Sequence, residues 1–290
     1  MSSKPKVAVI GLGLMGSGMA GRLIGEGFGL SVYNRSPQSA ALLGERGARV
    51  GKSPRDAATG ADFIVAMLAD DQASKGVWLG ENGALAGAAP GTILIESSTI
   101  SPAWVGELSK AAAARGCELL DAPVTGSKPQ AAAGQLVFLV GGSTAALEKS
   151  RPVLSVMSRE IVHLGPSGSG ALVKLINNFV CGVQAVALAE ALALIERTDL
   201  DAAKALAVLT EGAPGGPLVK TFSKRMTAGD FTPNFRLKLM LKDLQYAIKE
   251  ADARSLPMAT AAAAMATLNK AAESGLAEQD VSSVIEMLRK

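Results

Sequence analysis

The first residues whose types and spacing suggest chemistry are Gly11, Gly13 and Gly16, which form the pattern G-x-G-x-x-G. An apolar run over 7–10 precedes them and apolar residues at helical spacing follow, so they occupy a strand-to-helix turn. Gly11 would permit the tight turn, Gly13 would let a dinucleotide pyrophosphate approach the backbone, and Gly16 would let the helix pack closely. A glycine-rich turn without a ligand is the alternative, but the position between a buried strand and a helix favours dinucleotide binding.

The counts of histidine and cysteine limit what other chemistry the chain can do. His163 is the only histidine, and Cys117 and Cys181 are the only cysteines. They exclude a zinc site made of Cys and His ligands, and they leave His163 as the sole candidate for histidine-dependent catalysis. Because His163 ends a predicted strand beside a turn, we interpret it as structural. We expect two free, buried thiols and no metal.

The end of a predicted strand over 30–35 indicates which dinucleotide is bound. In NAD-binding versions, an Asp or Glu about 20 residues after the glycines holds the ribose 2′-hydroxyl. Here that place holds Asn34, Arg35 and Ser36. A guanidinium and a hydroxyl would hold a 2′-phosphate, which an acidic side chain would repel. The sequence therefore favours NADP(H), although Arg35 in an ordinary solvated loop is the alternative.

Strands that alternate with helices must position these residues. Strands are predicted over 7–10, 30–35, 48–50, 62–68, 92–96, 118–120, 137–140 and 161–164, and helices over 38–47, 102–114 and 144–154. This alternation implies an α/β fold with a doubly wound, mainly parallel sheet of the Rossmann type, whose ligands lie beyond the carboxyl ends of the strands. The candidate cofactor-binding residues at these ends are Leu12, Leu14, Met15, Met67, Leu68, Ala69 and Thr99.

A second, all-helical domain follows. One long helix is expected over 171–196, with further helices over 202–209, 218–226, 237–253, 258–272 and 282–289. The long helix is apolar almost all round, but Lys174, Asn178, Gln184 and Glu190 argue against a membrane span and favour burial between domains or subunits. The predicted organisation is a dinucleotide-binding domain over 1–166 and a helical domain over 167–290, assembled as a homodimer or homotetramer.

Lys174 and Asn178 are the polar pair of most interest in this helix. They are one helical turn apart, so they project from the same face. A lysine among apolar neighbours is usually a surface residue that extends its ammonium into water. Spacing alone leaves both interpretations open.

Four segments, taken together, resemble one enzyme family. Gly11 to Gly16, Asp121 to Gly126, Lys174 to Asn178 and Lys242 to Leu244 occur in the order seen in β-hydroxyacid dehydrogenases. This family includes 3-hydroxyisobutyrate dehydrogenases, tartronate semialdehyde reductases and glyoxylate/succinic semialdehyde reductases. The chain is most similar to the last group, and the resemblance spans nearly its whole length.

The resemblance implies roles for several residues. Lys174 would be the acid/base group that protonates an aldehyde oxygen as NADPH delivers hydride, and Asn178 would orient that lysine or the substrate. Thr99, Thr125 and the backbone N–H of Gly126 would hold the substrate carboxylate. The resemblance further assigns Phe235 and Asp243 to the substrate and Lys242 to the cofactor. Thr125 replaces the usual serine of the family, which adds a methyl group beside the carboxylate.

Other functions stay open alongside reduction of a small carboxylated aldehyde to the hydroxy acid. The main alternative is an NAD-dependent 3-hydroxyisobutyrate dehydrogenase working oxidatively. Imine reduction would use the same hydride geometry, and a cofactor-binding module without turnover is a further alternative. The net charge of +3 and scattered basic residues argue against a dedicated nucleic-acid surface. No apolar signal region follows the first lysines, so we expect a cytoplasmic protein without membrane attachment.

Overall fold

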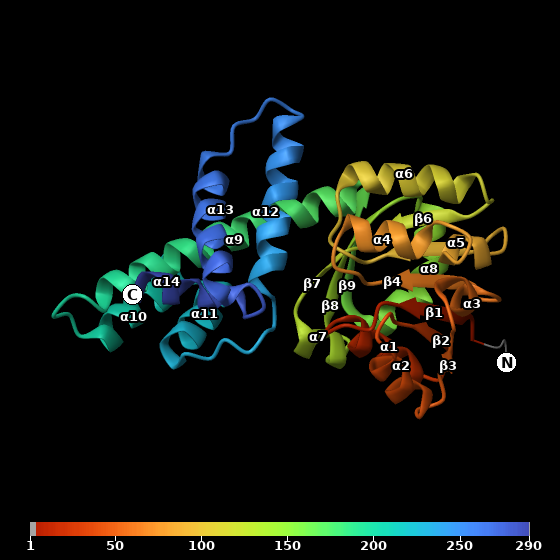
Figure 1. Cartoon of the computed structure of the whole chain (residues 1–290), viewed down its shortest axis with the longest axis horizontal. Helices are drawn as coiled ribbons and strands as arrows, with labels where there is room; N and C mark the ends of the chain where they lie inside the picture. Colours follow the sequence, from red (N-terminus) through yellow and green to blue (C-terminus); the bar gives the residue numbers. More distant parts are fainter. Residues whose placement is uncertain (1–3, 290) are drawn as a thin grey trace. The chain divides into compact units, whose positions relative to one another are not determined.

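The computed structural model describes residues 4–289. Its internal contacts divide the chain into two compact units, the first ending at Lys174 and the second beginning at Leu175 (Figure 1). The division lies inside helix α9 (Ser169–Ile195). The predicted domain boundary, between residues 166 and 167, lies just before this helix begins.

A 9-stranded sheet forms the first unit, in the order β3-β2-β1-β4-β5-β6-β8-β7 with β9 paired to β8. The strands are β1 (Lys6–Ile10), β2 (Gly29–Tyr33), β3 (Arg49–Val50), β4 (Phe63–Ala66), β5 (Ile93–Glu96), β6 (Glu118–Asp121), β7 (Val124–Thr125), β8 (Leu136–Gly141) and β9 (Ser158–Gly165). The pairs from β3 through β6 are parallel, whereas β8 runs antiparallel to β6 and β7. The predicted doubly wound, mainly parallel sheet is confirmed.

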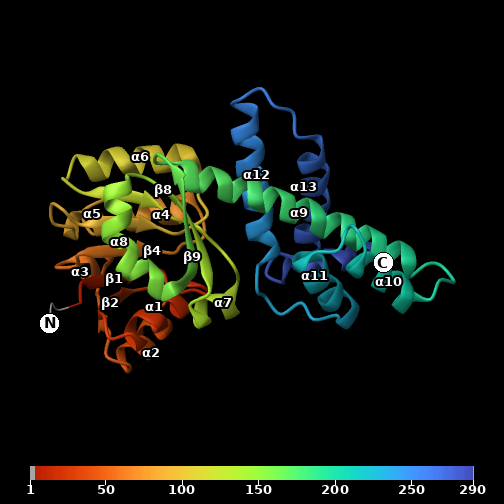
Figure 2. The same ribbon diagram turned by 180° about the vertical axis from the view of Figure 1, so that it is seen from behind.

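Helices cover both faces of this sheet. Successive side chains of β1 point to opposite faces and so pack against different helices. Val7 and Val9 join one buried cluster with residues of α1 and α8, whereas Ala8 and Ile10 join another with residues of α4 and α6. Figure 1 shows α4 and α6 on the near face, and Figure 2 shows α1 and α8 from the other side. The helices are α1 (Gly16–Gly25), α2 (Pro37–Gly44), α3 (Pro54–Ala58), α4 (Asp71–Trp78), α5 (Ala84–Gly87), α6 (Pro102–Ala113), α7 (Lys128–Ala133) and α8 (Thr144–Met157).

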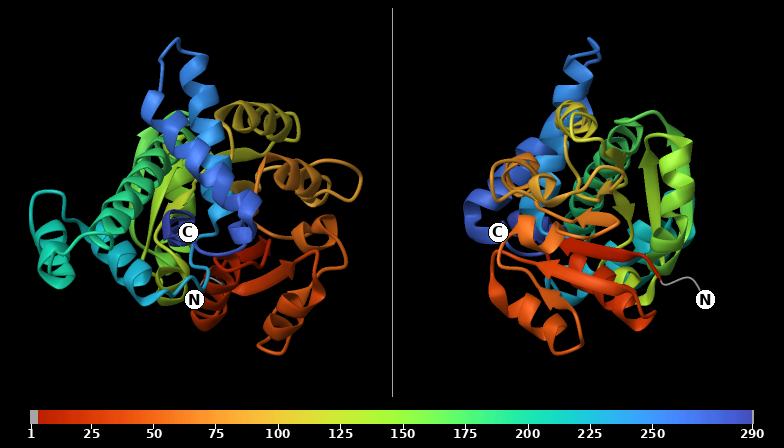
Figure 3. Two further views of the ribbon diagram at one scale, coloured as in Figure 1. Left: turned by 60° about the vertical axis from the view of Figure 1, so that its left-hand side comes forward. Right: turned by 90° about the vertical axis from the view of Figure 1, so that its right-hand side faces the viewer.

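Among its described residues, the second unit contains helices joined by loops and no β-strand. Besides most of α9, it contains α10 (Ala202–Glu211), α11 (Pro217–Ala228), α12 (Leu237–Asp252), α13 (Ala259–Ala271), a π-helical turn (Ala272–Leu276), a 3₁₀ helix (Val281–Ile285) and α14 (Glu286–Arg289). Helices α12 and α13 pack against each other (Figure 3). Leu244 of α12 and Leu268 of α13 belong to the same buried cluster. The helix predicted over 282–289 is therefore wrong in its first turn, which is 3₁₀.

Helix α9 is long and apolar enough, by length and composition, to cross a membrane: its most apolar window has a mean hydropathy of 1.8. In the second unit its buried residues Ala185, Ala189 and Leu192 belong to the core. Ile176 and Leu194 are instead 52% and 66% exposed. The helix thus serves as the core helix of its own unit and leaves apolar side chains on its surface.

Candidate active site

The glycine turn between β1 and α1 has two positions where only glycine fits. Gly11 has a φ of +91°, and a Cβ there would stand 2.3 Å from the carbonyl oxygen of Met67. A Cβ on Gly16 would stand 1.9 Å from the carbonyl oxygen of Gly11. By contrast, nothing lies within 4 Å of a Cβ built on Gly13. Two glycines therefore close the turn, and the third leaves open space at the start of α1 where a phosphate can approach the backbone.

Asn34 ties this turn to the end of β2. Its Oδ1 accepts a hydrogen bond from the N–H of Leu12 at 3.0 Å, and its Nδ2 donates to the carbonyl oxygen of Ser36 at 2.8 Å. The side chain of Asn34 thus holds two segments together. Arg35 and Ser36 are exposed directly beside it.

The ends of β4 and β5 meet at the same edge. Leu68 donates its N–H to Ser98 Oγ at 2.7 Å, which joins the 67–69 loop to the segment that carries Thr99. Met67, Leu68 and Thr99 are half-buried, and Ala69 is exposed. The predicted residues at these two strand ends are therefore brought together with Gly11, whose Cβ position is 2.9 Å from Leu68 Cδ2.

A fully buried carboxylate that sequence reasoning missed holds this edge. Glu96, the last residue of β5, accepts hydrogen bonds from Ser74 Oγ at 2.6 Å, Trp78 Nε1 at 2.7 Å and the N–H of Ser98 at 2.9 Å. Burial raises the pKa of the Glu96 carboxyl, and the three donors oppose that rise. An acidic residue at the end of an apolar strand is the signal that could have found it.

Thr125 is the last residue of β7, and Gly126 follows it. Gly126 has a φ of +110° and is exposed, and α7 begins directly afterwards. Helix α7 packs against α1, because a Cβ on Gly18 of α1 would stand 2.9 Å from the N of Ala132. This packing places the Thr125 loop next to the helix that follows the glycine turn.

Three predicted residues of the second unit form one cluster. Asn178 Nδ2 donates to Asp243 Oδ2 at 2.6 Å, and Lys242 Nζ lies 2.9 Å from Asp243 Oδ1. Asn178 is 4% exposed and Asp243 is 1% exposed, so the carboxylate is buried between an amide and an ammonium. Lys174 stands half-buried one turn before Asn178 on α9, as the helical spacing predicts.

Phe235 lies outside that cluster, in the loop before α12. Its N–H donates to the buried carboxylate of Asp280 at 3.0 Å, as does the N–H of Asn234 at 2.9 Å. The Phe235 side chain is half-buried against the helical core. Asp280 therefore fixes the position of the backbone at Asn234 and Phe235.

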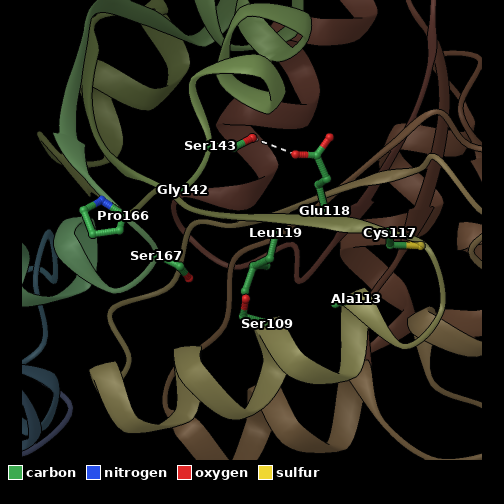
Figure 4. Close-up of a pocket in the computed structure, with 9 residues that line it drawn as sticks. All are labelled: Ser109, Ala113, Cys117, Glu118, Leu119, Gly142, Ser143, Pro166 and Ser167. Carbon is green, nitrogen blue, oxygen red and sulfur yellow. Dashed lines mark hydrogen bonds between the residues drawn. The ribbon is translucent and has the colours of Figure 1, made fainter.

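A cavity of about 410 Å³ lies elsewhere in the first unit (Figure 4). Cys117 and Leu119 line it at the start of β6, opposite the edge where ligands of such sheets bind. Burial raises the pKa of the Cys117 thiol, which disfavours the thiolate form. None of the residues that line this cavity is a predicted site residue.

The structure also shows the surroundings of His163 and of the two cysteines. A ring nitrogen of His163 lies 2.9 Å from the carbonyl oxygen of Gly142, in keeping with a structural role. Neither cysteine forms a disulfide, but Cys181 is only half-buried, so the expectation of two buried thiols is wrong for one of them. Among residues 4–289, no group of three or more His, Cys, Asp or Glu side chains could hold a metal ion.

Comparison with known proteins identifies the family. Residues 6–165 match the NAD binding domain of 6-phosphogluconate dehydrogenase, and residues 168–288 match the NAD-binding domain of NADP-dependent 3-hydroxyisobutyrate dehydrogenase. The chain belongs to the β-hydroxyacid dehydrogenase family. The predicted family is thereby confirmed, and this β-hydroxyacid dehydrogenase is an oxidoreductase that acts on CH–OH groups with a pyridine nucleotide.

Relatives of this β-hydroxyacid dehydrogenase differ in their named substrates. It is 38% identical over 96% of both chains to an NAD-dependent L-serine dehydrogenase of Pseudomonas aeruginosa. It is 33% identical over 98% of both chains to glyoxylate/succinic semialdehyde reductase 1 of Arabidopsis thaliana. The solved Mycobacterium tuberculosis 3-hydroxyisobutyrate dehydrogenase with L-serine is 33% identical, covers 99% of this chain and 100% of its own, and gives a TM-score of 0.90.

Proposed function

We propose that this protein reduces a small carboxylated aldehyde, such as glyoxylate or succinic semialdehyde, to the corresponding hydroxy acid with NADPH. One observation carries the choice of cofactor. The exposed Arg35 and Ser36 follow β2 where the Asn34 side chain is tied to the glycine turn. A cation and a hydroxyl there would bind a ribose 2′-phosphate.

The residues of the first unit fit such a cofactor. The open space at Gly13 and the start of α1 would hold the pyrophosphate. Met67, Leu68, Ala69 and Thr99 would contact the rest of the molecule from the ends of β4 and β5. The bound dihydronicotinamide would supply a hydride to the aldehyde carbon.

The protein's own residues would position the aldehyde and supply the proton. Thr99, Thr125 and the N–H of Gly126 would hold the substrate carboxylate, which fixes the carbonyl in place. The Lys174 ammonium would polarise the carbonyl oxygen and donate its proton to the alkoxide as it forms. Asn178 would orient Lys174 or the substrate.

The first experiment measures initial rates of NADPH and NADH oxidation with glyoxylate, succinic semialdehyde and methylmalonate semialdehyde. We expect NADPH-dependent turnover of the first two aldehydes. In Arg35→Glu, the preference for NADPH should fall about 10- to 100-fold, because a charge-assisted hydrogen bond contributes about 1.5–3 kcal/mol. The exposed Lys110→Glu is the matched control and should retain the preference. An unchanged preference in Arg35→Glu would contradict the cofactor assignment.

The role of Lys174 needs a separate variant. Lys174→Ala should lower kcat by roughly 10²–10⁴-fold, the usual contribution of a positioned acid/base group, with NADPH affinity largely retained. Retention of more than about a tenth of the wild-type kcat would contradict this role.

A second candidate function is oxidation of a β-hydroxy acid with NAD. The 38% identity to an NAD-dependent L-serine dehydrogenase favours it. The same assay decides between the two, because activity with NADH and the branched aldehyde alone would support an NAD-linked 3-hydroxyisobutyrate dehydrogenase. NAD-dependent oxidation of L-serine would support the same activity as that of the Pseudomonas aeruginosa relative.

We also propose that the protein assembles as a homodimer or homotetramer. Ile176, Val180 and Leu194 are exposed apolar residues of α9, and a partner subunit would remove them from water. Light scattering at micromolar concentration tests this proposal, and a monomer would contradict it.

A further inference from the structure

Asp121 begins the segment Asp121 to Gly126 and has no part in the proposed function. It is the last residue of β6 and is 0% exposed. Its Oδ1 accepts the N–H of Gly168 at 2.8 Å, and its Oδ2 accepts the N–H of Ala171 at 2.9 Å. Gly168 directly precedes α9 and Ala171 lies in its first turn, so one carboxylate satisfies two N–H groups at the start of the helix that carries Lys174.

The backbone at this place is packed as closely as glycine allows. A Cβ on Gly170 would stand 2.3 Å from the carbonyl oxygen of Leu139 and 2.5 Å from that of Asp121. A Cβ on Gly141 would stand 2.6 Å from Asp121 Oδ1, and Gly141 is also the β8 residue paired with Asp121. We call Asp121, Gly141 and Gly170 the α9 seat. The first turn of α9 rests directly on β6 and β8 there.

Because Ala171 and Lys174 lie in the same continuous helix, the contacts of the α9 seat also constrain the position of Lys174. Lys174 follows Ala171 by three residues, which is a rise of about 4.5 Å in an α-helix. No glycine or proline interrupts the helix between them. Ala171 and Leu175 are each 1% exposed, so this turn is also held by apolar burial. Fixing the N–H of Ala171 therefore fixes the direction in which the Lys174 side chain leaves the helix.

We propose that Asp121 is a positioning residue that sets the location of Lys174 through the first turn of α9. The inference rests on the proposed function, because it takes Lys174 as the group that donates the proton. Burial raises the pKa of the Asp121 carboxyl, and the N–H groups of Gly168 and Ala171 oppose that rise. A buried carboxylate is a costly means of stabilising a fold, which agrees with a role in placement.

The test compares Asp121→Asn and Asp121→Ala with the wild type. An asparagine keeps one acceptor oxygen, so kcat should fall about tenfold. An alanine keeps none, and kcat should fall about 100-fold, since a misplacement of about 1 Å can cost that much. The KM for the aldehyde and the Kd for NADPH should each change less than about threefold, because the fully buried Asp121 carboxylate is closed to both ligands. The matched control is Asp201→Asn, which removes a carboxylate cap from α10, where Asp201 Oδ1 accepts the N–H of Lys204 at 3.1 Å. It should leave kcat unchanged.

A second measurement does not depend on turnover. Amide hydrogen exchange of the peptide over 168–175 should quicken about tenfold or more in Asp121→Ala and stay at the wild-type rate in the control. A wild-type kcat in Asp121→Ala would overturn the inference, as would an equal loss of kcat and NADPH affinity, which a general structural role would cause. If the wild type reduces no aldehyde, the proposed function fails by itself. Unchanged exchange over 168–175 would then overturn the α9 seat independently.

Discussion

Replacing Glu96 with alanine should cause one of the larger stability losses available to a single substitution in the first unit. Glu96 is 0% exposed and its carboxylate receives three hydrogen bonds, from Ser74, Trp78 and Ser98. Ser74 Oγ in turn accepts Trp104 Nε1 at 2.8 Å. In Glu96→Ala, three buried donors lose their shared acceptor, and no side chain replaces it.

The expected magnitude follows from these contacts. A buried donor left without a partner costs about 1–3 kcal/mol, and the three costs are not additive because Ser74 can turn toward another acceptor. Removing a buried charge recovers part of its desolvation cost. We expect a loss of about 3–5 kcal/mol in the free energy of unfolding. With a urea m-value of about 2 kcal/mol/M, the midpoint should fall by about 1.5–2.5 M.

The chain offers a selective assay for this change. Its only two tryptophans are Trp78 and Trp104, and both indole N–H groups belong to the Glu96 network. Intrinsic tryptophan fluorescence during urea unfolding therefore reports on this core alone. The matched control is Glu107→Ala, whose carboxylate is 60% exposed and paired with Lys75, and it should cost less than about 1 kcal/mol. Equal midpoints for Glu96→Ala and Glu107→Ala would refute the reasoning.

Two further predictions concern the glycine turn and the stability of the fold at acid pH. Gly13→Ala should leave the free energy of unfolding within about 0.5 kcal/mol of wild type, because its Cβ meets no protein atom, yet weaken NADPH binding measured by fluorescence titration. Gly11→Ala should lose both stability and binding. Arg289 lowers the pKa of the Glu196 carboxyl, so this pair stabilises the fold above pH 4.5, the ordinary value of that carboxyl, and the contribution is lost as the pH falls through the lowered pKa. Urea unfolding of Glu196→Gln should show a deficit at pH 7 that shrinks in acid, and a deficit independent of pH would contradict it.

Local rules were sufficient for much of the fold. The glycine turn, the apolar strand that became β5 and the one-turn spacing of Lys174 and Asn178 each depend on residues close in sequence. The same holds for the change to helical sequence after residue 166. These features follow from periodicity and turn chemistry, which act over a few residues.

The parts that sequence reasoning missed depend on distant partners. Helix α4 is short and polar. It contributes to the core through Trp78, whose indole N–H donates a hydrogen bond to Glu96, eighteen residues later in the chain. The contacts of Asp121 with the start of α9 span 47 and 50 residues. A single sequence shows a carboxylate at the end of a strand but not which N–H groups it will receive. The sequence therefore marks both buried carboxylates as acidic residues at strand ends but does not show which segments they hold.

The two buried carboxylates have the same structural role: each holds a neighbouring segment through hydrogen bonds. Glu96 and Asp121 are register partners on the neighbouring parallel strands β5 and β6. Glu96 holds Ser98, whose hydroxyl holds the N–H of Leu68, while Asp121 holds the first turn of α9. Each thus fixes a segment that carries a proposed site residue, Thr99 in one case and Lys174 in the other. Because the supports are buried and the proposed substrate contact Thr125 lies on a separate loop, we expect a substitution at Thr125 to alter which of the proposed aldehydes fits without loosening Lys174, the proposed acid/base group.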